Sequence, residues 1–95
     1  MAPKFIETAT EISGLTTVKR LPSADTRGFF ERLVCTSEIN AWGNRPIKQI
    51  NRSTTKRKGV IRGLHLQNEP HSECKLITCL KGKVLDIAVD LRRNS

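Results

Sequence analysis

The sequence predicts an all-β protein of short antiparallel strands, arranged as a sandwich or a partly closed barrel. Short runs rich in Thr, Val and Ile recur along the 95 residues, with turn-forming residues between them. Residues 84–91 alternate apolar and polar side chains, as expected of a strand with one buried face. Only one segment favours a helix, and short strands at regular spacing with turn signals between them imply an antiparallel sandwich or barrel.

The N-terminal third is expected to contain three strands. Residues 5–12 and 15–21 are rich in Thr, Ile and Val, and they end at a Ser-Gly pair and at a proline. Residues 23–28 have the composition of a turn, and residues 29–34 follow as the third strand. The one short helix is expected near residues 36–42.

Capping residues define that helix. Thr36 or Ser37 could supply the N-cap, and Gly43 would end the helix. After Pro46, residues 47–53 alternate in type and are expected to form another strand.

The second half is expected to contain three further strands. These are residues 60–67, 75–80 and 84–91, with a tight turn at 80–83 before the last one. In the last strand the apolar side chains share one face, namely Leu85, Ile87, Val89 and Leu91, and the other face carries Asp86, Ala88 and Asp90. A sandwich that stops there has open edges, which need a partner or more chain. The length predicts a single domain over residues 1–95.

Composition indicates a soluble, reduced protein. Hydrophobic residues make up 37% and charged residues 27%, which is ordinary for a globular chain. The three cysteines (Cys35, Cys74 and Cys79) are odd in number and form no Cys-x-x-Cys pair. With no signal peptide and no apolar run long enough to span a membrane, they predict free thiols in a cytoplasmic protein.

The formal net charge of +8 suggests an anionic partner, such as a nucleic acid, a nucleotide or an acidic surface. The densest cluster lies at residues 52–62 and contains Lys56-Arg57-Lys58. We interpret the triplet as a solvated turn between strands. A phosphate-binding role for Arg62 stays open.

His65 and Lys75 are the candidate catalytic pair. A neutral imidazole accepts a proton near pH 7, and an ammonium can hold a developing oxyanion. Proton abstraction beside a carbonyl requires that combination. A lone histidine is more often a core residue and a lone lysine more often a surface one, but Arg62 is close to His65 in sequence, and a bulge at Gly63 would let both side chains point inward.

Three more polar residues are candidates. Gln49 and Asn51 are alternate residues of a strand, so their amides share a face and could contact a ligand. Asp86 faces away from the apolar row; it is either solvent-exposed or a carboxylate that orients His65.

A metal site is not expected. Gly59 and His65 match the start of a metal-binding motif found in many cupin-type jelly rolls, but Gln67 replaces its second histidine. His71 lies in a proline-led turn, so no triad of ligands remains.

Several separate motifs, in order, carry a family resemblance: Arg27-Gly28-Phe29-Phe30, Gln49-x-Asn51, Arg62-Gly63-Leu64-His65-x-Gln67, Lys75-Leu76 and the strand from Asp86 to Arg92. With them, residues 5–95 resemble the N-terminal half of the dTDP-4-dehydrorhamnose 3,5-epimerases. The resemblance implies a cupin-type jelly roll and usually a homodimer, which acts without a cofactor on dTDP-4-dehydro-6-deoxyglucose. dTDP-L-rhamnose and surface polysaccharide synthesis would be the setting.

The resemblance also implies residue roles. His65 would remove the protons at C3 and C5, both α to the C4 ketone, and Lys75 would stabilise the enolate oxygen. The substrate-binding residues would be Arg27, Gln49, Asn51 and Arg62. A nucleotide-sugar substrate explains the positive charge more economically than nucleic acid does.

Two departures from the family pattern matter. Arg32 stands where the family often has a glutamate that contacts the nucleotide, so the nucleotide or sugar preference is expected to differ. The chain has no tyrosine, whereas the family's proton-donating tyrosine and a supporting aspartate lie in its second half. The alternatives are a truncated, non-catalytic cupin that binds a dTDP-sugar or a partner chain, and a small basic nucleic-acid-binding barrel.

Overall fold

The computed structural model describes residues 2–66 and 74–93. The chain divides into two compact units, one of Met1–Pro46 with Asp86–Ser95 and the other of Ile47–Leu85. The single domain that we expect over residues 1–95 stays a prediction. No described residue belongs to a helix with the length and apolar character needed to cross a membrane.

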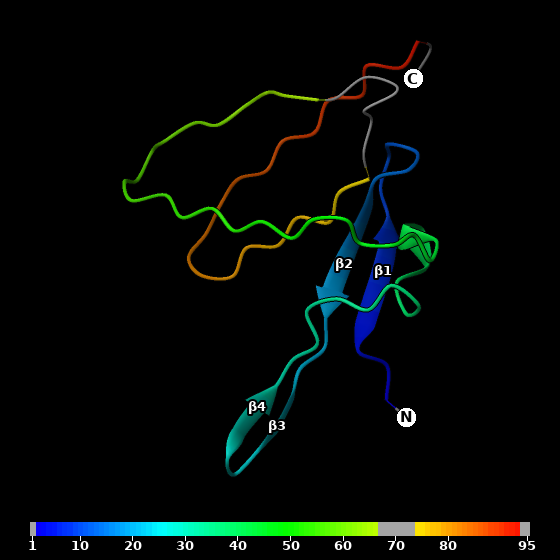
Figure 1. The fold of residues 1–95 in the computed structure, drawn as a ribbon, viewed down its shortest axis with the longest axis vertical. Coiled ribbons are helices and arrows are strands. Elements are labelled where there is room, and N and C mark those ends of the chain that lie inside the picture. Colours follow the sequence, from blue (N-terminus) through cyan, green and yellow to red (C-terminus); the bar gives the residue numbers. More distant parts are fainter. Residues whose placement is uncertain (1, 67–73, 94–95) are drawn as a thin grey trace. The chain divides into compact units, whose positions relative to one another are not determined.

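Two antiparallel strands form the main sheet of the first unit (Figure 1). β1 is Phe5–Ala9 and β2 is Thr16–Arg20, in a register that opposes Phe5 to Arg20. Thr10 fixes the connection between them, because its backbone N–H and its hydroxyl both donate to the Leu15 carbonyl, at 3.2 and 2.7 Å. The first two expected strands are therefore confirmed, each a few residues shorter than the sequence predicts.

A second, smaller hairpin follows. β3 is Ser23–Asp25 and β4 is Gly28–Phe30, and they pair antiparallel. The sequence predicts a six-residue turn at 23–28 and a strand at 29–34, so the paired region begins earlier and ends earlier than expected. Asp25 explains the tighter turn: its carboxylate accepts the Arg27 backbone N–H at 2.8 Å, which closes the chain within two residues.

A single 3₁₀ turn, η1 (Asn40–Trp42), replaces the helix expected near 36–42. Gly43 ends it in a left-handed conformation, with φ 71° and ψ 32°, as the sequence predicts. Ile39, rather than Thr36 or Ser37, occupies the N-cap position, and it provides no side-chain cap. Ile39 is 3% exposed and is the one buried hydrophobic residue among those described.

Glu7 of β1 supplies the missing cap. Its two carboxylate oxygens accept the backbone N–H groups of Asn40 at 2.9 Å and Ala41 at 2.8 Å. A carboxylate suits this position because the first N–H groups of a helical turn have no partner within it. The contact joins residues 33 positions apart and ties η1 to the sheet.

The end of the chain also belongs to this unit. Arg92 donates to the Ser13 carbonyl at 2.6 Å and pairs with Asp90 at 2.8 Å. The Asp90 carboxylate raises the pKa of the Arg92 guanidinium. These contacts hold the segment after Asp86 against the connection between β1 and β2.

The second unit contains turns but no paired strand in its described residues, 47–66 and 74–85. The turns at 57–59 and 81–82 lie where the sequence predicts them (Figure 1). The strands expected at 47–53, 60–67, 75–80 and 84–91 are not formed among the described residues. The physical reason is that alternation decides which side chains share a face, whereas a strand also needs a neighbouring backbone to pair with.

Among the described residues the regular structure is thus nearly all-β, with small antiparallel sheets and almost no helix, and this much of the expected fold class is confirmed.

Candidate functional site

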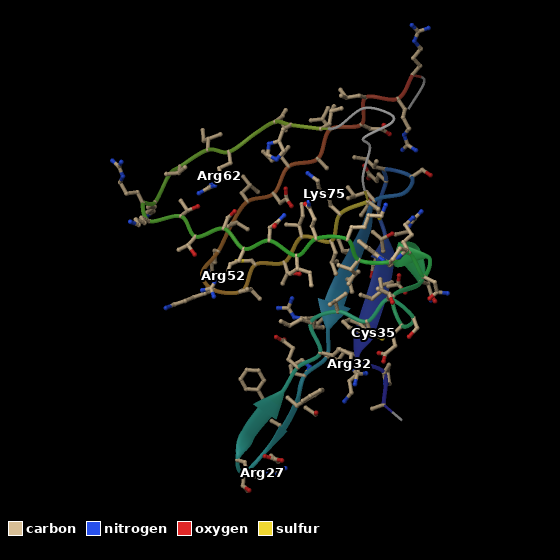
Figure 2. The ribbon with its side chains drawn as sticks, in the orientation of Figure 1. Arg27, Arg32, Cys35, Arg52, Arg62 and Lys75 are labelled. Atoms are coloured by element: carbon tan, nitrogen blue, oxygen red, sulfur yellow. The ribbon has the colours of Figure 1, made fainter. Side chains whose placement is uncertain are left out.

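The structure places most of the predicted site residues in one unit. The Ile47–Leu85 unit holds Gln49, Asn51, Arg62, His65 and Lys75, whereas the other unit holds Arg27 and Asp86. All seven side chains are exposed. Figure 2 labels Arg62 and Lys75 within the first set and Arg27 at the tip of the β3–β4 hairpin.

His65 is positioned by a glycine two residues before it. Gly63 has φ +100°, a conformation that residues with a side chain rarely adopt. A Cβ at Gly63 would lie 3.2 Å from Nδ1 of His65 and 3.6 Å from Cε1, which is a tight contact. The Nδ1 and Cε1 atoms of the imidazole therefore lie beside the glycine. The sequence predicts a bulge at this glycine that turns Arg62 and His65 inward; in the structure residues 60–66 form no paired strand, and both side chains are exposed.

Gln49 and Asn51 present their amides together. Nδ2 of Asn51 lies 3.5 Å from Oε1 of Gln49, at the limit of a hydrogen bond. The contact puts both amides on one side of the segment, as expected for alternate residues of an extended chain. Such a pair offers both donors and acceptors to a ligand.

Arg27 is held at the turn of the β3–β4 hairpin by Asp25. Its guanidinium pairs with the Asp25 carboxylate at 2.7 Å through Nη2 and 3.3 Å through Nε. The side-chain and backbone hydrogen bonds from Arg27 lower the pKa of Asp25 from its ordinary value. The Arg27 side chain is 89% exposed, so it can still donate to a phosphate.

Asp86 is exposed and belongs to the unit that does not contain His65. The idea that it orients His65 therefore stays a prediction.

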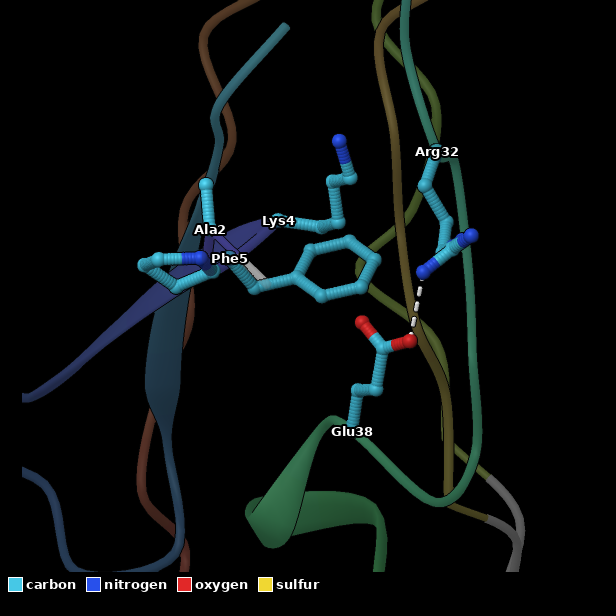
Figure 3. Close-up of a pocket in the computed structure, with 6 residues that line it drawn as sticks. Ala2, Lys4, Phe5, Arg32 and Glu38 are labelled. Carbon is cyan, nitrogen blue, oxygen red and sulfur yellow. Dashed lines mark hydrogen bonds and ion pairs between the residues drawn. The ribbon is translucent and has the colours of Figure 1, made fainter.

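A hollow that the sequence does not reveal lies in the first unit (Figure 3). It measures about 310 Å³ and is lined by Ala2, Pro3, Lys4, Phe5, Arg32 and Glu38. Arg32 pairs with Glu38 at 2.5 Å. No local pattern could have found this hollow, because it depends on the contact between the N-terminal residues and a segment about thirty residues later.

Lys4 and Arg32, two of the residues that line the hollow, also lie close to an aromatic ring. Lys4 Nζ lies 5.5 Å from the centre of the Phe30 ring, and Arg32 Cζ lies 5.9 Å from it. Both distances are within the range of cation–π attraction. The sequence marks Arg32 only as a departure from a family pattern; the structure gives it two partners, Glu38 and Phe30.

Metal-ligating side chains do not gather in the part of the chain that the structure describes. No group of three or more His, Cys, Asp or Glu residues is close enough there to hold an ion. Cys35 is half-buried, and Cys74 and Cys79 are exposed. Gln67 and His71, which the sequence analysis considered for a metal motif, lie outside the described residues.

Comparison with known proteins gives a consistent result. A family model described as dTDP-4-dehydrorhamnose 3,5-epimerase matches residues 9–95. The chain is 45% identical over 74 residues to a 3,5-epimerase of Streptomyces griseus, covering 76% of this chain and 36% of that protein. It is 39% identical over 72 residues to the Shigella flexneri 3,5-epimerase, covering 75% of this chain and 40% of that protein.

A third relative carries a different name. The chain is 35% identical over 86 residues to a Streptomyces niveus dTDP-4-dehydrorhamnose 3-epimerase, covering 88% of this chain and 41% of that protein. The chain spans less than half the length of these curated relatives. No solved structure matches the fold closely. Because the family model matches nearly the whole sequence, the chain belongs to the dTDP-4-dehydrorhamnose 3,5-epimerase family.

Proposed function

We propose that the protein epimerises a dTDP-4-dehydro-6-deoxy sugar by removing a proton next to the C4 ketone, with His65 as the base. The observation that carries this proposal is the exposed imidazole of His65, with its Nδ1 beside Gly63. The family of the chain and the names of its relatives supply the substrate class.

The chemistry follows from the properties of the two candidate catalytic groups. His65 Nε2 accepts the proton, the C–H bond breaks, and its electron pair moves through the new double bond to the carbonyl oxygen. The Lys75 ammonium stabilises that enolate oxygen. Return of a proton to the opposite face of the carbon inverts it, and the donor for this step is not among the residues proposed.

Substrate binding is assigned to groups that match the charges of a nucleoside diphosphate sugar. Arg62 and Arg27 are exposed guanidinium groups that can take phosphate oxygens in a bidentate contact. The amide pair of Gln49 and Asn51 can hydrogen-bond to hydroxyl and carbonyl groups. Asp86 is proposed as a supporting residue.

The same proposal includes a cupin-type jelly roll, a homodimer, a cytoplasmic location and no cofactor. The antiparallel pairing of β1 with β2 and of β3 with β4 supports the jelly roll, which is an antiparallel fold.

Proton NMR in D₂O tests the proposal directly. The protein is incubated with dTDP-4-dehydro-6-deoxyglucose, and the signals at C3 and C5 are followed against a sample without protein. We expect deuterium to enter at one or both positions. Exchange at C3 alone would indicate a 3-epimerase, the activity named for the Streptomyces niveus relative.

Two variants separate the roles of the basic residues. His65→Ala should abolish exchange because it removes the base, whereas Lys56→Ala, in the exposed segment before the 57–59 turn, should leave exchange nearly unchanged. An equal loss in both variants would contradict the assignment of the base. Binding of the dTDP-sugar by a folded protein without any exchange would instead favour the non-catalytic alternative.

A further inference from the structure

The hollow in the first unit combines positive charge with an apolar wall. Its volume of about 310 Å³ lies at the lower end of the range of small-molecule pockets, roughly 300–1,000 Å³. Every residue that lines it belongs to the unit of Met1–Pro46 with Asp86–Ser95, so the hollow is formed within one compact unit. These dimensions suit a small ligand.

Lys4 supplies a cation without a counterion. The contact of its ammonium among the described residues is with the face of the Phe30 ring, whose centre lies 5.5 Å from Nζ. A ring face attracts a cation but does not neutralise its charge. Because Lys4 is half-buried, an anion bound to it would be partly shielded from water, which strengthens the pairing.

Arg32 supplies a second cation with donors to spare. Its Nη1 pairs with Oε1 of Glu38, and the two side chains are 31% and 38% exposed. A guanidinium carries several N–H donors in a planar fork, so one carboxylate oxygen on Nη1 leaves further donors for a second acceptor. Figure 3 shows the Phe5 ring extending from β1 toward this pair.

The balance of charge selects the kind of ligand. Two cations and one carboxylate line the hollow, which gives it a net charge of +1. A single carboxylate neutralises this charge, whereas a dianionic phosphate would place an excess negative charge beside Glu38. The remaining wall is apolar, formed by Ala2, Pro3 and the Phe5 ring, and fits the hydrocarbon part of a ligand.

We propose that this hollow binds a small monocarboxylate that has an apolar body. Lys4 and Arg32 hold the carboxylate, and the Phe5 ring packs against the apolar body. The site belongs to the unit that does not contain His65, and it is independent of the proton abstraction proposed above.

Titration with benzoate, followed by two-dimensional NMR of the backbone amides, tests the site. We expect a saturable shift of the Lys4, Phe5 and Arg32 amide signals, with a dissociation constant of about 1 mM or below. Benzamide has the same shape without the charge and should bind at least about tenfold more weakly. Phenyl phosphate, a dianion with the same ring, should also bind more weakly than benzoate.

Matched variants locate the contact. Lys4→Gln removes the ammonium and should weaken benzoate binding about tenfold or more, whereas Lys4→Arg keeps the charge and should stay within about threefold. Lys19→Gln is the control, because Lys19 is an exposed lysine of β2 that does not line the hollow; its loss should change the affinity less than about twofold. Retained protection of the β1 and β2 amides against hydrogen exchange in each variant shows that the sheet is still formed.

Glu38→Gln tests the charge balance itself. The variant raises the net charge of the lining from +1 to +2, so the preference should move from the monoanion toward the dianion. We expect the affinity for phenyl phosphate, relative to that for benzoate, to rise about tenfold.

Four results would overturn the proposal. They are the absence of a saturable shift up to about 10 mM benzoate, equal binding of benzamide and benzoate, an equal loss in Lys4→Gln and Lys19→Gln, and an unchanged preference in Glu38→Gln. None of these measurements uses a dTDP-sugar or follows proton exchange, so a failure here is distinct from a failure of the proposed epimerase activity.

Discussion

Replacing Gly63 with alanine tests whether the backbone at this glycine positions His65. Two effects follow from the structure. A φ of +100° is unfavourable for alanine by about 1–2 kcal/mol, and the new Cβ would lie 3.2 Å from Nδ1 of His65. The imidazole must then move by a few tenths of an ångström or more. Because proton transfer depends steeply on position, we expect exchange at C3 and C5 to slow by about tenfold.

Gly59→Ala is the matched control. Gly59 has a similar φ of +84°, but a Cβ there would meet nothing within 4 Å. The control therefore carries a similar backbone strain without contact to the imidazole. Two-dimensional NMR of the His65 ring signals gives a readout that does not depend on activity: these signals should shift in Gly63→Ala and stay in place in Gly59→Ala. Equal effects of the two variants on ring shifts and on exchange would refute the reasoning.

Two further predictions concern the first unit. Glu7→Ala removes the acceptor of the Asn40 and Ala41 N–H groups, so local stability should fall by about 2 kcal/mol and both amides should exchange at least about tenfold faster. Glu7→Gln keeps one acceptor oxygen and should lose less local stability. Unchanged hydrogen exchange of the Asn40 and Ala41 amides in Glu7→Ala would contradict the role of Glu7 as the cap. Hydrogen bonds from Arg27 lower the pKa of Asp25 below its ordinary value of 3.8, so their contribution to the hairpin is complete above that value and disappears as pH falls through the lowered pKa. An NMR titration of the Asp25 carboxyl between about pH 2 and 6 should show this lowered pKa, and Arg27→Ala should return it toward the ordinary value.

Local features of the first unit were predictable from sequence. β1 and β2 are adjacent in the chain and rich in β-branched residues, so composition and one short connection are enough to identify them. Gly43 marked the end of η1 for a similar local reason. The cap from Glu7 was not predictable, because it joins residues 33 positions apart and Ile39, at the N-cap position, has no capping side chain.

The second unit shows the limit of pattern-based reasoning more clearly. The alternation in residues 60–67 and 84–91 predicts strands, and the turns at 57–59 and 81–82 are where the sequence places them. Pairing is a property of two segments, so a pattern within one segment cannot supply the partner. The same applies to the candidate site: motifs identified the residue types, whereas only geometry could show that the His65 ring packs on Gly63.

The nucleotide-sugar substrate that we propose accounts for the charge of the protein more economically than a nucleic acid does. The basic triplet Lys56–Lys58 is exposed and belongs to the Ile47–Leu85 unit, whose sequence contains no Phe, Tyr or Trp. Proteins that bind single strands without sequence preference combine a basic groove with aromatic rings on which the bases stack. In the other unit, Lys4 and Arg32 already contact the Phe30 ring, and the Trp42 indole N–H donates to a backbone carbonyl at 2.7 Å. The proposed dTDP-sugar needs no stacking surface beside the triplet, because individual arginines would recognise its phosphate groups.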